Sequence, residues 1–83
     1  MIQVQVKFLC REYTGEMENG IYSLSDGSTI ADLIAACEEQ YKIRINDAAK
    51  NYLRFMVDSR ISSWDHKLDD GQTVLVMRLV SGG

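Results

Sequence analysis

Two glycines at the end of the chain, Gly82 and Gly83, are the residues whose type and spacing point most directly to chemistry. Glycine has no side chain to pack and loses the most conformational entropy on ordering. Chain ends also fray unless other contacts hold them. We therefore expect an exposed tail, about residues 81–83, that enters a narrow site on another protein and presents the Gly83 carboxylate for reaction. A chance pair of glycines and an end created by cloning are the alternatives.

Other side chains that could do chemistry stand alone in the sequence. Cys10 and Cys37 are the two cysteines and His66 is the single histidine, and together they lack the spacing of a zinc site. Both cysteines fall on apolar faces, which predicts buried, reduced thiols, with one disulfide as the alternative. His66 lies in a polar loop and is predicted to be solvated. The pair Glu38–Glu39 is expected on a solvated helix face.

The composition describes an ordinary globular chain of 83 residues, with 46% hydrophobic and 25% charged residues, and we expect one domain, residues 1–83. A net charge of −3 without a cluster of Lys and Arg argues against nucleic acid as a partner. No stretch approaches the roughly 20 apolar residues of a membrane span. Residues 1–7 alternate apolar and polar residues instead of forming a signal peptide, so we expect a cytoplasmic protein.

Hydrophobic periodicity predicts four main strands and one helix. Thr29 and Asp32 are spaced as a capping pair at the start of the helix. Its buried stripe should comprise Ile30, Leu33, Ile34, Cys37 and Tyr41. The strands are predicted at 2–10, 21–25, 52–59 and 73–80, the helix at 29–42, and loops at 11–18, at 43–51 with a helical turn near 47–50, and at 61–70 with a pairing segment near 60–62. Trp64 should cover one end of the core.

This order of elements predicts an α+β fold, in which a mixed sheet of four to five strands packs one main helix against one face. The connection between the first and last strands contains the helix, so these two strands are expected to be parallel and central. That is the β-grasp, or ubiquitin-like, arrangement.

The face of this sheet that points away from the helix is a candidate docking face. If Val74 and Val76 face the helix, then Leu75, Met77 and Leu79 point the other way, and Met56 could join them. Gln3, Gln5 and Lys7 would form a polar border. Apolar patches with polar borders are typical of protein interfaces. A covering loop or a homodimer would also explain the pattern. Arg78 near the tail is expected to pair with a partner's carboxylate or to remain solvated.

Three segments resemble one known family. Residues 24–34, LSDGSTIADLI, and residues 68–74, LDDGQTV, followed by residues 80–83, VSGG, are similar to the strand–turn–helix segment, closing strand and tail of the MoaD/ThiS family of ubiquitin-like sulfur carriers. The resemblance covers essentially the whole chain. The length suits the small subunit of molybdopterin synthase better than the shorter thiamine carriers. Arg78 and Leu79 stand where many relatives have prolines, and Asp58-Ser59 replaces a common Asn-Gly turn, which leaves the partner's identity open.

The resemblance implies a carrier that binds no cofactor itself and has its catalytic residues on its partners. A ubiquitin-activating-type enzyme would use ATP to adenylate Gly83, and a sulfur donor would convert the adenylate to a thiocarboxylate. The large subunit of a synthase would then accept the sulfur, in molybdopterin biosynthesis. The reactive end is Gly82–Gly83, and the expected partner-binding residues are Met56, Leu75, Met77, Arg78, Leu79, Val80 and Ser81.

Three other functions remain open at this point. The carrier could serve thiamine, cysteine or tRNA thiolation. The activated Gly83 could instead be attacked by a lysine amine, which would make the chain a protein modifier joined by isopeptide bonds. A plain β-grasp interaction module would use no tail chemistry at all.

Overall fold

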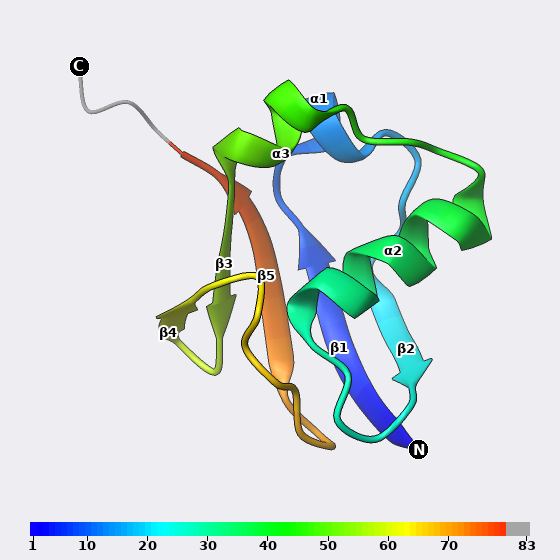
Figure 1. Cartoon of the computed structure of the whole chain (residues 1–83), viewed down its shortest axis with the longest axis vertical. Coiled ribbons are helices and arrows are strands. Elements are labelled where there is room, and N and C mark those ends of the chain that lie inside the picture. The colour runs from blue at the N-terminus through cyan, green and yellow to red at the C-terminus, as the bar shows by residue number, and fades with distance from the viewer. Residues whose placement is uncertain (80–83) are drawn as a thin grey trace.

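Five strands form one sheet, and a long helix crosses one face of it (Figure 1). The computed structural model describes residues 1–79. In chain order the elements are β1 (Ile2–Phe8), α1 (Arg11–Thr14), β2 (Gly20–Leu24), α2 (Ile30–Tyr41), α3 (Asp47–Tyr52), β3 (Leu53–Val57), β4 (Arg60–Ser62) and β5 (Thr73–Arg78). The strands lie side by side in the order β2-β1-β5-β3-β4.

The centre of the sheet is the parallel pair β1–β5, as the sequence predicts. Gln5 lies opposite Thr73 and Phe8 lies opposite Val76. On either side, β2 is antiparallel to β1 and β3 is antiparallel to β5. Buried and exposed residues alternate along all of β1, and Val74 and Val76 of β5 are fully buried beneath α2 and the rest of the core. The predicted β-grasp arrangement is therefore confirmed.

Local chemistry sets both ends of α2. The Thr29 hydroxyl accepts from the Asp32 amide, and the Asp32 carboxylate accepts from the Thr29 amide at 2.9 Å, so the predicted capping pair forms. The helix ends at Tyr41, because the next residue, Lys42, has a left-handed backbone (φ 56°) that stops the α-helical repeat. The predicted stripe of Ile30, Leu33, Ile34 and Cys37 is buried, and Tyr41 is half-buried.

The segment 63–68 folds against the start of α2. The carbonyl oxygens of His66 and Trp64 accept from the amides of Ile30 and Ala31, two N–H groups that the helix leaves unpaired. Trp64 meets Phe55 edge to face at 4.7 Å and covers the core as predicted. The prediction of a solvated His66 is wrong, because this packing buries its Nε2 atom, which has no hydrogen-bond partner among residues 1–79.

Some element boundaries differ from the predicted ones. The predicted loop 11–18 contains α1, because buried Thr14 and Met17 hold this segment against the core. Tyr52 ends α3 instead of beginning β3. The strand β5 ends at Arg78, opposite Leu53, which is the first residue of β3, and beyond this pair one more hydrogen bond joins the Leu79 amide to the Tyr52 carbonyl. The predicted end of this strand, at residue 80, lies outside the described residues.

Candidate functional site

The sheet face that points away from α2 brings several apolar side chains together. We call Leu9, Met56, Ile61, Leu75 and Met77 the docking face. Met56 lies between Leu75 on β5 and Ile61 on β4. Leu75, Met77 and Met56 are half-buried, whereas Ile61 is 82% exposed and Leu9 is 60% exposed. Exposed apolar side chains that lie next to one another are typical of a surface that binds another protein.

Charge on this side of the sheet has one sign. Among the strand residues whose side chains point away from α2, the charged ones are Lys7 and Arg54, and none is Asp or Glu. Lys7 lies opposite Leu75, and Arg54 lies opposite Met77. The chain as a whole has a net charge of −3, whereas the charged strand residues on this side are positive; the nearest carboxylates, Asp58 and Asp70, lie in turns at one end of the sheet. A partner surface with carboxylates around an apolar centre would complement it.

The structure separates Arg78 from the docking face. Arg78 lies opposite the buried Leu53, so its side chain is on the helix side of the sheet. There its Nε atom lies 3.4 Å from Oε1 of Glu12, and both side chains are about half exposed. An exposed ion pair of this kind contributes little stability. The carboxylate next to Arg78 in this structure thus belongs to the same chain, and the expected pairing of Arg78 with a partner's carboxylate stays a prediction.

The last described residue, Leu79, marks the root of the predicted tail. Its amide donates to the carbonyl oxygen of Tyr52 at 2.6 Å, and its side chain is 44% exposed. The remaining predicted site residues, Val80, Ser81, Gly82 and Gly83, lie outside the described residues. Four residues span at most about 14 Å when fully extended. A partner that reacts with Gly83 must therefore contact this end of β5 closely.

Both thiols are free and buried, as the sequence predicts. Burial raises the pKa of the Cys37 thiol from 9.0 to about 12. Burial also raises the pKa of the Cys10 thiol, with a smaller contribution from Glu12. Because a thiol must ionise to act as a nucleophile, these two residues serve packing. Within residues 1–79 no three His, Cys, Asp or Glu side chains gather as metal ligands, and no described helix is long and apolar enough to cross a membrane.

Three residues near the site were not predicted. Leu9 and Ile61 extend the docking face at positions where an alternating strand normally exposes polar residues, and that mismatch is the signal that could have found them. Glu38 was expected on a solvated helix face. That interpretation is wrong, because its side chain is only 17% exposed and its carboxylate accepts from the Ile45 amide at 2.8 Å.

Comparison with known proteins decides the family. The model of the ThiS family matches residues 9–83, which is most of the chain and includes both terminal glycines. The chain belongs to the ThiS family. This confirms the resemblance to ubiquitin-like MoaD/ThiS sulfur carriers that the sequence motifs indicate. No curated protein sequence matches the chain.

Solved structures support the fold of this ThiS-family chain. A protein of Pyrococcus furiosus described as molybdopterin converting factor, subunit 1, has a TM-score of 0.71 at 24% identity, over 96% of this chain and 100% of that one. Small archaeal modifier protein 1 of Haloferax volcanii also has a TM-score of 0.71, at 10% identity, over 96% and 100%. Ubiquitin of Caldiarchaeum subterraneum has a TM-score of 0.60 at 10% identity, over 99% and 98%. At these identities the likeness shows a ubiquitin-like β-grasp fold. Together with the family match, it makes the chain a ubiquitin-like protein of the ThiS family.

Proposed function

We propose that this protein is a sulfur carrier whose Gly83 carboxylate is adenylated, converted to a thiocarboxylate and used to donate sulfur. The observation that carries the proposal is the family match, which runs through Gly82 and Gly83. A cytoplasmic location and an intact reactive end at Gly83 are parts of the same proposal.

The chemistry explains why the carrier needs a partner enzyme. A carboxylate is a poor electrophile, so an activating enzyme first joins Gly83 to the AMP portion of ATP and releases pyrophosphate. A sulfur nucleophile then attacks the acyl carbon, forms a carbon–sulfur bond and expels AMP. When the sulfur passes to an acceptor, water attacks the acyl carbon, the carbon–sulfur bond breaks, and the carboxylate is regenerated. The carrier is a cosubstrate in this scheme. Glycines at positions 82 and 83 let the backbone pass through a narrow channel without side-chain collisions.

The docking face gives the carrier a surface for these partners. Met56, Leu75 and Met77 form its centre, and Leu79 and the residues after it would continue toward the partner's active site. Methionine adapts to differently shaped surfaces, which suits a protein that must meet both an activating enzyme and the large subunit of a synthase. Lys7 and Arg54 favour partners with carboxylates at the matching border.

Molybdopterin biosynthesis is the pathway we propose for the donated sulfur. The structural similarity to the Pyrococcus furiosus protein described as molybdopterin converting factor, subunit 1, over 100% of that chain, supports this choice. Thiamine, cysteine and tRNA thiolation would use the same tail chemistry with another acceptor. The acceptor protein therefore decides the pathway.

Protein modification is the second candidate function. The similarity to small archaeal modifier protein 1, over its full length, favours it. In this case a lysine amine of a target protein attacks the Gly83 adenylate or a derived thioester, and an isopeptide bond replaces the carbon–sulfur product.

Reconstitution with an activating enzyme, ATP and sulfide separates these functions. If the protein is a carrier, one oxygen of its Gly83 carboxylate is replaced by sulfur, and its mass rises by the difference between the two atoms. Methionine oxidation adds nearly the same mass, and the chain has four methionines, so the product must be digested with trypsin. Cleavage after Arg78 leaves residues 79–83, which contain neither Met nor Cys. Sulfur in this peptide supports the carrier, whereas higher-mass adducts in cells that vanish without Gly83 support the modifier. A chain whose function survives deletion of both glycines would be an interaction module.

A further inference from the structure

A cavity of about 470 Å³ opens at the edge of the sheet, where the edge strand β4 is shorter than its neighbour β3. β4 ends at Ser62, opposite Phe55, whereas β3 begins earlier, at Leu53. In the described part of the chain, no strand pairs with the start of β3 on this side. We call this space the Trp64 cavity. It is lined by the apolar side chains of Leu53, Phe55, Ile61 and Trp64, together with Arg54 and Ser62.

The Trp64 cavity combines buried apolar walls with an accessible aromatic side chain. Leu53 and Phe55 are each only 1% exposed. Trp64 packs edge to face against Phe55, with ring centroids 4.7 Å apart, but remains half-buried. Tryptophan offers a large, rigid contact area, and it is enriched among the residues that dominate binding energy at interfaces. The cavity is therefore suited to an apolar side chain of another protein.

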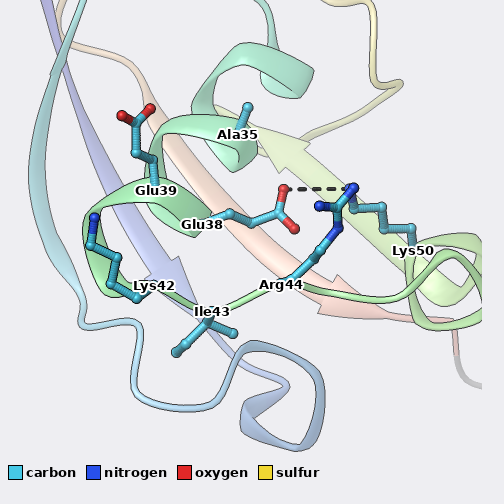
Figure 2. A pocket seen from close by; sticks show the side chains of 7 residues that line it. All are labelled: Ala35, Glu38, Glu39, Lys42, Ile43, Arg44 and Lys50. Atoms are coloured by element: carbon cyan, nitrogen blue, oxygen red, sulfur yellow. Dashed lines mark ion pairs between the residues drawn. The ribbon is translucent and has the colours of Figure 1, made fainter.

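The cavity between α2 and α3 differs in kind (Figure 2). Charged side chains line it, and Oε1 of Glu38 lies 3.4 Å from Nζ of Lys50, so opposite charges already meet there within the chain. In the Trp64 cavity the one charged side chain is that of Arg54, which is exposed and donates from Nη1 to the carbonyls of Asn51 and Leu53 at 2.8 Å. Among residues 1–79 no carboxylate forms an ion pair with it. A partner carboxylate next to an apolar side chain would complement this combination.

The position of the Trp64 cavity places it beside the root of the tail. Leu53 lies opposite Arg78, the last residue of β5, and neighbouring strands are about 4.8 Å apart. Residues 80–83 span at most about 14 Å, so an enzyme that reacts at Gly83 contacts the molecule within that distance of Leu79. Ile61 also belongs to the docking face. An enzyme that lies on the docking face and reaches Gly83 therefore meets the Trp64 cavity.

We propose that the Trp64 cavity receives an apolar side chain of the activating enzyme and anchors the protein while Gly83 is adenylated. A carboxylate next to that side chain faces Arg54. The proposal rests on the proposed function only as far as the activation of Gly83, a step that a carrier and a modifier share. Anchoring fixes the body of the protein relative to the enzyme's active site, and reaction at a carboxylate depends on such placement.

Cross-saturation measured by NMR on the full chain tests the contact. The protein is deuterated and labelled with ¹⁵N, the activating enzyme is unlabelled, and irradiation of the enzyme's aliphatic protons weakens the N–H signals that lie against it. Trp64 is the only tryptophan, so its indole N–H gives a single signal. We expect this signal to weaken together with the amides of Leu75 and Met77, whereas the amide of Ser23 in β2 should keep its intensity. Weakening at Leu75 and Met77 without Trp64 would overturn the proposal and leave the proposed function intact. Absence of any weakening, together with absence of AMP release, would refute the proposed function itself.

A cavity-filling variant tests whether the contact contributes to binding. Ser62→Leu places atoms of the chain itself in the Trp64 cavity, and Ser23→Leu makes the same substitution on the opposite edge strand, β2. We expect KM for AMP release to rise at least about tenfold for Ser62→Leu, with kcat unchanged, and to stay at the wild-type value for Ser23→Leu. Equal KM values for the two variants would overturn the proposal. If urea unfolding shows that Ser62→Leu destabilises the fold, the cross-saturation of Trp64 in the wild type decides alone.

Discussion

Replacement of Leu9 by Gln should weaken docking without harming the fold. The Leu9 side chain is 60% exposed and lies at the end of β1, beside β5 and near the root of the tail. Full burial of a leucine is worth about 1.5–3 kcal/mol, so burial of the exposed part beneath a partner would contribute roughly 1–2 kcal/mol. Its loss corresponds to a roughly five- to thirtyfold rise in KM for activation. Because the position is exposed, the free energy of unfolding should change by no more than about 0.5 kcal/mol.

The assay is AMP release by the activating enzyme over a range of carrier concentrations, with urea unfolding as the check on stability. Ile21→Gln is the matched control, because Ile21 is 68% exposed on the same side of the sheet but on the edge strand β2. We expect KM to rise for Leu9→Gln alone, with kcat unchanged. Equal effects of the two variants, or a change in kcat without KM, would refute the assignment of the docking face.

Two further predictions concern charge and pH. Lys7→Gln should slow association with the activating enzyme about two- to fivefold at low salt and reduce its salt dependence, measured by stopped flow, whereas Lys67→Gln, an equal change of charge away from the docking face, should not. Burial raises the pKa of the Cys37 thiol from 9.0 to about 12, so the unfolded thiol ionises first as the pH rises. The contribution of the buried Cys37 thiol to the free energy of unfolding is thus fully present below about pH 9 and decreases as the pH rises above it. Between about pH 8 and about pH 10.5 the wild type should lose about 2 kcal/mol more than Cys37→Ala in urea unfolding, and equal losses would count against this burial.

The sheet and α2 were predictable because their signals are local. Alternation along residues 2–10 and the capping pair Thr29–Asp32 each involve neighbours in sequence. Even the position of Arg78 follows from this rule, since it shares the parity of Val74 and Val76 and must point toward the helix side. The sequence interpretation grouped it with Leu75 and Met77 because all lie near the tail.

The missed features depend on contacts between distant segments. α1 has four residues and no periodic pattern, and it forms where Thr14 and Met17 enter the core. Glu38 lies off the apolar stripe of α2, and its role appears only when residues 43–52 fold across it. The single-domain boundary, 1–83, and the reactive end stay predictions.

The most direct test of the carrier account is the C-terminal peptide of the protein purified from its own cells under conditions that exclude added sulfide. After trypsin digestion, the account predicts a peptide of residues 79–83 that ends at Gly83 and occurs partly with sulfur in place of one carboxylate oxygen. A peptide that continues past Gly83 in the mature protein, or one that never carries sulfur even when an active acceptor enzyme is absent, would contradict it.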